Sequence, residues 1–578
     1  MKVGTIVKKR KLNIKKAIIS SLVLITIVFA FATLSKQLIG SFKSSVTYYL
    51  ASSTNEVPLY DEELKEVKKK YRGNKINIFE NKFIKKDNKK YMEIKEEGKT
   101  LYIDTANLVK NSHDVVLEKE LYVQVSTSLL KDISDIHIVS LAKKGSQVNI
   151  LDYDKLNDKG LVNMYKVKIE DNEGYIYAKY LVDTEEEAQA NYEAETYDKI
   201  HSKIKNSYNG GNAINLDYYP VEKPKFDNNK MPDSVYSLYL NSGKNVIKNI
   251  DKYIEFAKDT KINTFVVDII DDSAIGYASP ILKELSPTSY KYANNTVEEY
   301  KEAITKLKEA GFYVVGRITA FKATHYVKDH PENSIKNVKT NEPYLHSKAY
   351  WPTPYSREVW YYDVSLAKEA VELMGFNEIN FDYVRFPDKM TSIEKNNQVD
   401  LGNTYNEEKA QAIQRFLQYA TDELHKSNVY VSVDVFGEST NGTYVTAYGQ
   451  YWPAISNVVD VISGMPYPDH FSKGYYGIDK PWNHPYELMT AWAKDAAKRQ
   501  KETTSPAIVR TWIQAFNVQS YVDPNGIAYE AEEIEKQVTA LFEQGLKGGY
   551  ITWLSSSNID KYKIQKKAFA IDYLKEVK

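Results

Sequence analysis

Hydrophobic and polar positions follow two different patterns along this 578-residue chain. Between residues 71 and 182, short β-type runs alternate with polar turns, which is typical of small all-β domains. From about residue 231, apolar strands alternate with stretches whose apolar residues recur every three or four positions, as in amphipathic helices. The pattern predicts all-β domains first and an α/β domain in the rest of the chain.

The α/β region contains eight strand-and-helix repeats. The predicted strands are residues 235–240, 264–268, 312–318, 378–387, 429–434, 458–462, 507–513 and 549–553. Eight such repeats fit a (β/α)8 TIM barrel, a fold of ~200 to more than 400 residues. A doubly wound open sheet is the alternative, but the chain lacks the Gly-rich phosphate fingerprint of that fold.

The N-terminus predicts a membrane anchor. Residues 1–16 are rich in Lys and Arg, and the following apolar run suits a transmembrane helix over residues 17–35, since such a helix takes ~20 residues. The positive-inside rule places residues 1–16 in the cytoplasm and the bulk of the chain outside the cell, as a single-pass protein of the cell membrane. A cleaved signal peptide ending near Ala32 is the alternative, but the apolar run exceeds the usual ~7–15 residues.

Changes in pattern predict the remaining domain boundaries. Residues 60–112 are a possible small β domain, although the charged stretch 62–70 has a helical composition. Residues 118–184 are a second β domain, residues 185–230 a linker with an acidic run and Gly and Pro breaks, and residues 231–578 the barrel.

Composition excludes several functions. Lys+Arg and Asp+Glu both number 77, so the chain lacks the basic excess of a dedicated nucleic-acid-binding protein. Cys is absent, which excludes disulfides, a thiol nucleophile and thiolate metal sites.

Three carboxylates follow neighbouring strands of the predicted barrel. Asp382 and Asp434 end the fourth and fifth strands, and Glu438 follows the fifth. Active sites of TIM barrels form at these strand ends, and glycoside hydrolysis requires two carboxyl groups in different protonation states. Asp382 is therefore a candidate nucleophile, kept ionised by Arg385 or Arg317, and Glu438 or Asp434 is the candidate acid/base. The non-catalytic explanation of Asp382 is a structural ion pair with Arg385.

Other polar and aromatic side chains near these strand ends are candidates for binding sugars, since sugar rings stack on aromatic faces. They are Asp268, Arg317, Trp351, Tyr383, Arg385, Tyr467, His470, Arg510, Trp512, Gln514 and Trp553. For each aromatic ring, packing in the core is the alternative. This chemistry requires neither a metal ion nor an organic cofactor.

Two other functions remain open. A non-catalytic protein that binds wall polymers or exopolysaccharide would reuse the same barrel. A metal-dependent polysaccharide deacetylase is suggested weakly by Asp271 and Asp272 with His325 and His330, whose spacing matches no established ligand pattern.

Several motifs in residues 231–556 resemble a bacterial family named "Putative glycosyl hydrolase domain". The matching stretches are residues 267–272, 276–277, 316–318, 321–322, 351–355, 369, 375–387, 433–437, 465–470 and 510–514. The run Asp382-Tyr-Val-Arg-Phe-Pro387 is the most specific of them. The resemblance implies a TIM barrel related to α-amylase-type hydrolases and a hydrolase activity, without naming a substrate.

The second β domain resembles bacterial SH3-like domains, and the first resembles them more weakly. The similarity lies in Lys143-Lys-Gly145 and Gly174-Tyr-Ile-Tyr-Ala-Lys-Tyr-Leu181. In that family such domains often hold enzymes to cell-wall polymers, although a spacer without a ligand is equally consistent with the sequence. We therefore expect a membrane-anchored, extracytoplasmic glycoside hydrolase that acts on a cell-wall or extracellular polysaccharide.

Overall fold

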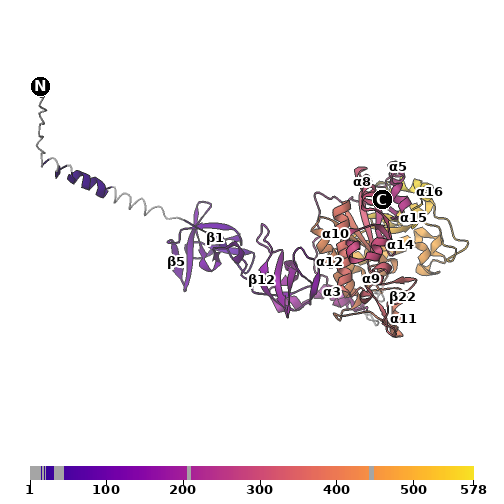
Figure 1. The fold of residues 1–578 in the computed structure, drawn as a ribbon, viewed down its shortest axis with the longest axis horizontal. Coiled ribbons are helices and arrows are strands. Elements are labelled where there is room, and N and C mark those ends of the chain that lie inside the picture. Colours follow the sequence, from indigo (N-terminus) through magenta and orange to yellow (C-terminus); the bar gives the residue numbers. More distant parts are fainter. Residues whose placement is uncertain are drawn as a thin grey trace, which may run out of the picture. The chain divides into compact units, whose positions relative to one another are not determined.

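A computed structural model describes residues 15, 18–19, 21–30, 45–204, 210–441 and 448–577 (Figure 1). The chain divides into two compact units, residues 1–119 with 150–165, and residues 120–149 with 166–578. The first unit is all-β, and the second contains β strands followed by a large α/β domain. The predicted order of an all-β region before an α/β region is confirmed.

The first unit contains two antiparallel sheets around a small apolar core. Its strands are β1 (Val46–Leu50), β2 (Glu56–Tyr60), β3 (Glu66–Tyr71), β4 (Lys75–Ile78), β5 (Phe83–Lys86), β6 (Lys89–Glu96), β7 (Lys99–Asp104) and β8 (Leu108–Val109). Alternating side chains such as Ile76 and Ile78 on β4, and Met92 and Ile94 on β6, fill the core. Asp87 and Asn88 adopt positive φ between β5 and β6, as a two-residue hairpin turn requires.

The expected helix over residues 62–70 is wrong, because β3 occupies most of this stretch. β3 pairs with β2 at the edge of the order β3-β2-β7-β6-β5. Lys68 and Lys70 both contact Glu96, at 3.2 and 2.8 Å. Lys and Glu favour helices in isolation, but strand pairing overrides this weak preference, and a charged edge strand also resists aggregation.

The second β region docks on the α/β domain. Its strands are β9 (Glu120–Val123), β10 (Thr127–Leu130), β11 (Ile138–Ala142), β12 (Gln147–Tyr153), β13 (Met164–Ile169), β14 (Asn172–Tyr177) and β15 (Leu181–Val182). Lys179 and the Tyr180 hydroxyl both contact Asp422 of helix α12, at 2.5 and 2.7 Å. The Tyr419 hydroxyl of the same helix donates to the Ile136 carbonyl at 2.9 Å. The tyrosine-rich end of this region is therefore occupied by α12.

Eight parallel strands form a nearly closed barrel. They are β16 (Val235–Leu240), β17 (Thr264–Asp271), β20 (Tyr313–Thr319), β24 (Glu378–Asp382), β26 (Tyr430–Phe436), β27 (Val461–Met465), β28 (Ile508–Val509) continued by β29 (Thr511–Gln514), and β30 (Gly549–Trp553). Their order is β28-β27-β26-β24-β20-β17-β16-β30-β29. Each predicted strand is present, with ends that differ by a few residues.

The barrel closes at its seventh and eighth strands. The seventh strand is interrupted at Arg510, so that β28 pairs with β27 and β29 pairs with β30. β30 then pairs with β16, with Gly549 opposite Val235. Gly549 has φ of 104°, and a Cβ there would lie 1.9 Å from the Val235 carbonyl oxygen, so only glycine allows this approach.

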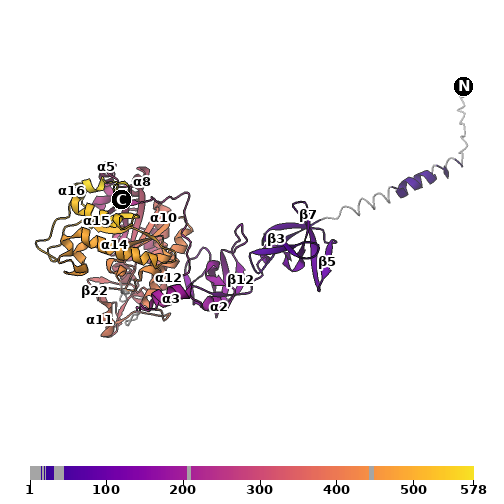
Figure 2. The ribbon, with the colours of Figure 1, turned by 180° about the vertical axis from the view of Figure 1, so that it is seen from behind.

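Helices cover the outside of the barrel (Figures 1 and 2). The helices of this unit are α2 (Glu185–Gln189), α3 (Ala194–His201), α4 (Lys244–Lys248), α5 (Ile250–Lys258), α6 (Pro280–Leu285), α7 (Pro287–Lys291), α8 (Val297–Glu309), α9 (Thr324–Asp329), α10 (Arg357–Met374), α11 (Met390–Lys395), α12 (Lys409–His425), α13 (Trp452–Val458), α14 (Pro485–Lys501), α15 (Ala531–Glu543), α16 (Ile559–Phe569) and α17 (Tyr573–Glu576). Short strands β18 (Ala274–Tyr277), β19 (Ala293–Asn295), β21 (Lys336–Asn337), β22 (Leu345–His346), β23 (Ala349–Tyr350) and β25 (Val399–Asp400) lie in the connections.

The barrel interior is polar along β24 and β26. Side chains on a strand alternate between faces, so Glu378, Asn380 and Asp382 share one face of β24. Glu378 contacts Arg510 near the amino ends of the strands, whereas Asp382 contacts Arg317 near their carboxyl ends. The interior therefore holds ion pairs near both ends of the strands.

The described parts of the predicted linker, residues 185–204 and 210–230, contact the barrel domain. The imidazole of His201 stacks on Tyr218 with 3.8 Å between ring centres, and its Nδ1 lies 2.8 Å from the Tyr451 hydroxyl. The amide of Asn229 donates to the carbonyls of Asn377 and Asn428 at 2.7 and 2.8 Å, at the amino ends of β24 and β26. These contacts make the end of the stretch part of the barrel domain.

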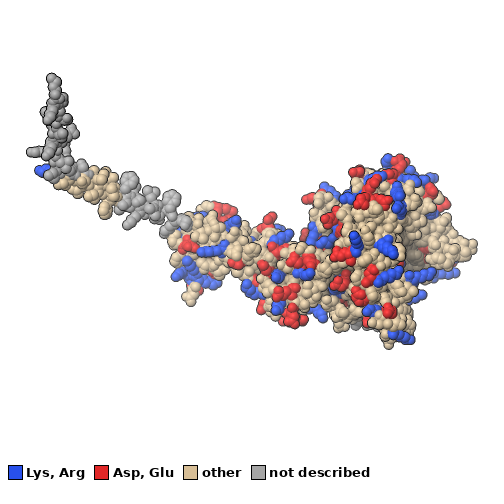
Figure 3. Space-filling model, viewed as in Figure 1, with Lys and Arg blue, Asp and Glu red and all other residues tan. Residues whose placement is uncertain are grey.

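Residues 17, 20 and 31–35 of the predicted anchor lie outside the described residues. Residues 21–30 are helical, and their apolar side chains are exposed. Among the residues with described positions, no helix is both long and apolar enough to cross a membrane. On the face shown in Figure 3, basic and acidic side chains are interspersed, in keeping with equal numbers of the two.

Candidate active site

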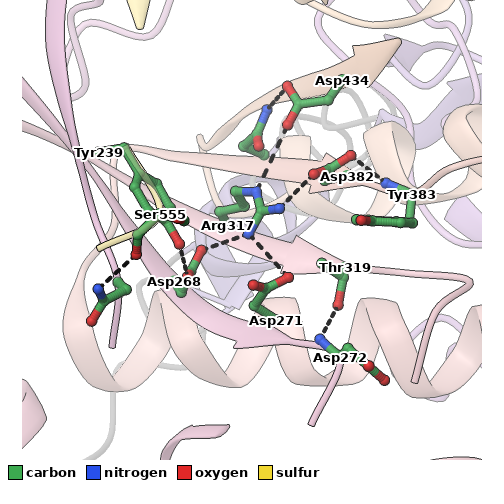
Figure 4. Close-up of polar contacts among 12 residues, drawn as sticks. Tyr239, Asp268, Asp271, Asp272, Arg317, Thr319, Asp382, Tyr383, Asp434 and Ser555 are labelled. Carbon is green, nitrogen blue, oxygen red and sulfur yellow. Dashed lines mark hydrogen bonds and ion pairs between the residues drawn. The ribbon is translucent and has the colours of Figure 1, made fainter. Parts of the chain in front are cut away.

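A single buried guanidinium joins carboxylates from three strands (Figure 4). Arg317, on β20, is 1% exposed. Its Nη2 donates to Asp382 on β24 at 2.5 Å, and its Nη1 donates to Asp268 on β17 at 2.7 Å. Its Nε lies 3.9 Å from Oδ2 of Asp434 on β26. Burial opposes the Arg317 charge, but Asp382, Asp268 and Asp271 outweigh it and raise the pKa of Arg317 well above its usual range.

Asp382 has a donor at each of its oxygens. Oδ2 accepts from Arg317, and Oδ1 accepts from the backbone N–H of Tyr383 at 2.6 Å. These two contacts fix the orientation of the carboxyl group. The side chain is 9% exposed, at the carboxyl end of β24. Asp382 is therefore held at the strand end predicted for the active site.

Asp434 has a different environment. It is fully buried, and its Oδ1 accepts from Trp512 Nε1 at 2.7 Å and from the Asn380 amide at 2.9 Å. Its Oδ2 has no hydrogen-bond partner. Burial and the nearby Asp382 raise the pKa of Asp434 well above its usual range, against the opposing effects of Arg317 and the two donors. The strand next to that of Asp382 thus carries a carboxyl group whose burial favours its protonated form.

Asp268 is the third partner of the guanidinium. The Tyr239 hydroxyl donates to its Oδ2, and the Tyr300 hydroxyl donates to its backbone carbonyl at 2.7 Å. Burial raises the pKa of Asp268 to about 7, although Arg317 opposes this shift. Asp271, at the end of the same strand, is partly exposed and lies 3.6 Å from Nη1 of Arg317.

Aromatic rings surround this cluster. The Tyr239 and Trp553 ring centres lie 5.8 and 5.4 Å from Cζ of Arg317. Trp512 packs against both rings and donates to Asp434. Tyr467 is buried, and the nearby Asp434 and Asp382 add to the effect of burial in raising its pKa. Four aromatic side chains therefore form low-dielectric walls beside the carboxylates.

Arg385 does not pair with Asp382. It lies 3.0 Å from Asp388, and its Cζ is 4.3 to 5.1 Å from the ring centres of Phe436, Tyr383 and Trp351. Tyr383 has a φ of 52°, which is an uncommon backbone conformation for a bulky residue. The chain therefore turns at Tyr383, between Asp382 and Arg385. The ion pair with Arg385 considered for Asp382 is therefore wrong, and Arg317 is the partner of Asp382.

Glu438 is not among the carboxylates that contact Arg317. It is exposed, in a 3-10 turn over Gly437–Thr440 directly after β26. Its charge acts on the hydroxyls of Tyr448 and Tyr475. Of the two candidate acids, the structure brings Asp434 to Asp382.

Three of the predicted substrate-binding residues make other contacts. Arg510 is fully buried and its Nη1 donates to Glu378 at 2.6 Å, near the amino ends of the strands and away from the mouth. The side-chain oxygen Oε1 of Gln514 accepts from the backbone N–H of Asp469 at 3.0 Å, which fixes the loop after β27. His470, in that loop, is exposed and packs edge-on against Tyr467.

Sequence reasoning missed Asn380 and Tyr239. Asn380 precedes Asp382 by two positions, and this spacing on a strand predicts a shared face, so it was accessible from the sequence. Tyr239 reads as an ordinary apolar position of β16, and no local signal separates it from Tyr236. Its role depends on β17, the neighbouring strand.

The side chains that suggested a metal site are engaged separately. Asp271 contacts Arg317, and Asp272 accepts from the backbone N–H of Thr324. His325 stacks on Tyr292, and Nε2 of His330 contacts the Leu285 carbonyl. Within the described ranges, no group of three or more His, Cys, Asp or Glu side chains could hold a metal ion.

The fold and these contacts define a parallel barrel with carboxyl groups at the carboxyl ends of its strands, where the active sites of TIM-barrel enzymes form. A family model described as "Putative glycosyl hydrolase domain" matches residues 237–559. The match covers more than half of the chain, and the chain belongs to this family. The resemblance found from the motif around Asp382 is confirmed.

Three solved structures illustrate further similarity. A hypothetical protein from Ruminiclostridium thermocellum ATCC 27405 is 31% identical, covering 34% of this chain and 97% of its own, with a TM-score of 0.29. The PgaB (BpsB) glycoside hydrolase domain from Bordetella bronchiseptica is 13% identical, covering 59% and 100%, with a TM-score of 0.41. The β-N-acetylhexosaminidase from Bacteroides fragilis NCTC 9343 is 13% identical, covering 58% and 65%, with a TM-score of 0.38. No curated protein matches the chain.

Proposed function

We propose that the barrel is a glycoside hydrolase whose reacting pair is Asp382 and Asp434. The observation that carries the proposal is that one guanidinium, Arg317, contacts both carboxyl groups, which lie on adjacent strands. Asp382 has two donors and supplies the anion, as nucleophile or as stabiliser of the oxocarbenium-like transition state. Asp434 retains its proton and supplies the acid.

Burial supports the assignment of Asp434 as the acid. A general acid must hold its proton near the working pH, which requires a pKa well above that of an ordinary aspartate. Trp512 and Asn380 both donate to Oδ1 of Asp434, so the proton is directed to Oδ2, the oxygen without a partner. Glu438 lacks this environment because it is exposed.

The first experiment measures reducing ends released by the full-length chain from peptidoglycan, teichoic acid and secreted glycans. On any substrate found, Asp382→Asn and Asp434→Asn are expected to lower kcat by about 10²- to 10⁴-fold. Glu438→Gln is the matched control, since it changes a carboxylate near the same strand end. If Glu438→Gln removes activity and Asp434→Asn does not, the acid is Glu438 and the assignment is wrong.

Burial of the cluster also favours a second candidate function, a barrel that binds glycans without cleaving them. Asp268, Arg317 and Asp434 are each at most 1% exposed, as expected of a structural ion network. This function predicts saturable binding of a glycan with no released ends. It also predicts that Asp434→Asn leaves the affinity unchanged.

The cellular setting extends the proposal. The exposed apolar helix over residues 21–30 and the basic residues before it support a single-pass anchor with the barrel outside the cytoplasm. The β regions between anchor and barrel would hold the enzyme near its cell-wall or extracellular polysaccharide. Protease protection of the barrel in intact cells would contradict this orientation.

A further inference from the structure

The guanidinium that joins the two carboxyl groups is itself held by a second set of contacts. Arg317 donates to Asp382 through Nη2, and its other terminal nitrogen, Nη1, donates to Asp268 at 2.7 Å. Tyr239 donates to the other carboxyl oxygen of Asp268, and Tyr300 donates to its backbone carbonyl at 2.7 Å. Asp268 is thus fixed at its side chain by Tyr239 of β16 (Figure 4). It is fixed at its backbone by Tyr300 of α8.

These residues are engaged with one another. The two carboxyl oxygens of Asp268 accept hydrogen bonds from Arg317 and from Tyr239, and all three side chains are buried. The sequence predicts that Asp268 and Arg317 bind substrate, and in the structure they contact each other and Asp382. Any effect they have on a reaction acts through Asp382 and Asp434.

We propose that Asp268 and Tyr239 are a positioning pair that controls how much of the Arg317 charge acts on Asp382 and Asp434, and so sets the pH at which Asp434 loses its proton. The inference rests on the proposed role of Asp434 as the acid. It assigns Asp268 and Tyr239 a role different from substrate binding.

The charges around Arg317 give the direction of the effect. The groups that face it are Asp268 and Asp271 from β17, Asp382 from β24, Asp434 from β26 and the Tyr239 hydroxyl from β16. Asp434 is also faced by Asn380, Trp512 and Tyr467. An ionised Asp268 offsets part of the Arg317 charge. Removing that negative charge leaves a stronger positive field at Asp434, which favours its anion and lowers the pH of proton loss.

Tyr239 acts in the same direction through Asp268. Its hydroxyl favours the ionised form of Asp268, because it donates to a carboxyl oxygen. Without it, Asp268 holds its proton at higher pH and offsets less of the Arg317 charge. Tyr239→Phe should therefore produce a smaller shift of the same sign as Asp268→Asn.

The test follows the indole N–H of Trp512, which donates to Asp434 and reports its protonation without any turnover. The full-length chain is labelled with 15N-tryptophan, and its seven indole signals are recorded as pH is varied. Trp512→Phe assigns the signal. Asp268→Asn is expected to lower the midpoint of its titration by about one pH unit, and Tyr239→Phe by less.

Asp271→Asn is the matched control. Asp271 lies on the same strand and faces the same nitrogen, but at 3.6 Å and with about a third of its side chain exposed, so solvent screens its charge. Its substitution should shift the midpoint less than Asp268→Asn. An equal shift would overturn the proposal, as would an unchanged midpoint in Asp268→Asn or Tyr239→Phe, or a Trp512 signal that does not titrate.

The readout separates this inference from the proposed function. A shifted midpoint in a protein that releases no sugar from any glycan supports the positioning pair and contradicts hydrolysis. Turnover with an unshifted midpoint supports hydrolysis and overturns the positioning pair. If Asp268→Asn disturbs the other six indole signals, Tyr239→Phe, which removes one oxygen atom and no charge, decides the outcome.

Discussion

Breaking the ion pair between Glu378 and Arg510 tests whether Arg510 is structural. Both side chains are fully buried, with 2.6 Å between Arg510 Nη1 and Glu378 Oε1. Removing one partner leaves an uncompensated charge in the barrel interior, which costs about 3–5 kcal/mol. Arg510→Met and Glu378→Leu should therefore each lower the free energy of unfolding by that amount.

The double variant should be more stable than either single variant. Replacing both charges with apolar groups of similar volume is often nearly neutral, because no charge is left buried. The Tyr313 hydroxyl, which donates to Glu378 Oε2 at 3.1 Å, would still lose its acceptor, at about 1–3 kcal/mol. Recovery in the double variant thus distinguishes an ion pair from two independent packing effects.

Urea unfolding of the full-length chain, followed by tryptophan fluorescence, measures these changes. All seven tryptophans lie at or after residue 351, so the signal reports the barrel alone. Lys536→Met is the control, because Lys536 forms an exposed pair with Glu532 and its loss should cost less than about 1 kcal/mol. An unchanged midpoint in Arg510→Met together with loss of glycan binding would refute the structural role and restore Arg510 as a substrate contact.

Two further predictions concern closure of the barrel and its stability. Gly549→Ala places a Cβ 1.9 Å from the Val235 carbonyl oxygen and should prevent β30 from pairing with β16, with loss of the native tryptophan emission. Gly545→Ala is the control, because Gly545 also has positive φ but nothing lies within 4 Å of the added Cβ. This control should lower the free energy of unfolding by only about 1 kcal/mol. Burial raises the pKa of Asp268 in the folded protein to about 7, whereas its pKa in the unfolded chain is near 4. The protonated carboxyl group therefore contributes fully to the free energy of unfolding below pH 4, and this contribution is lost as pH rises to about 7. The stability of wild type relative to Asp268→Asn should therefore fall by up to about 4 kcal/mol over this range in urea titrations, and a difference independent of pH would contradict the shift.

The sequence alone predicted the barrel strands well, because each is a short apolar run between polar turns or amphipathic helices. The order of strands follows from this repeat, since parallel strands joined by helices are neighbours in a right-handed barrel. The expected helix over residues 62–70 failed because Lys and Glu composition indicates propensity, whereas pairing with β2 depends on residues elsewhere in the chain.

The position of the candidate site was also predictable, but the sequence left its pairings open. Asp382 and Asp434 were found because carboxylates at the ends of buried strands have no packing explanation. Arg385 and Arg317 were both candidate partners of Asp382, and the structure shows that Arg385 contacts Asp388 instead, beyond the turn at Tyr383. Arg317 is 65 residues away in the chain and reaches Asp382 because β20 and β24 are neighbours in the barrel.

The sequence by itself determined the alternation of strands and helices and the strand ends that carry charge, because both depend on local periodicity. Only the tertiary structure decided which charges meet. Arg317 belongs with Asp268, Asp382 and Asp434, and Arg510 with Glu378, because strand order and register bring these side chains into one interior at two different heights. The free energy of a buried charge depends on its neighbours in space, and those neighbours come from strands far apart in the chain.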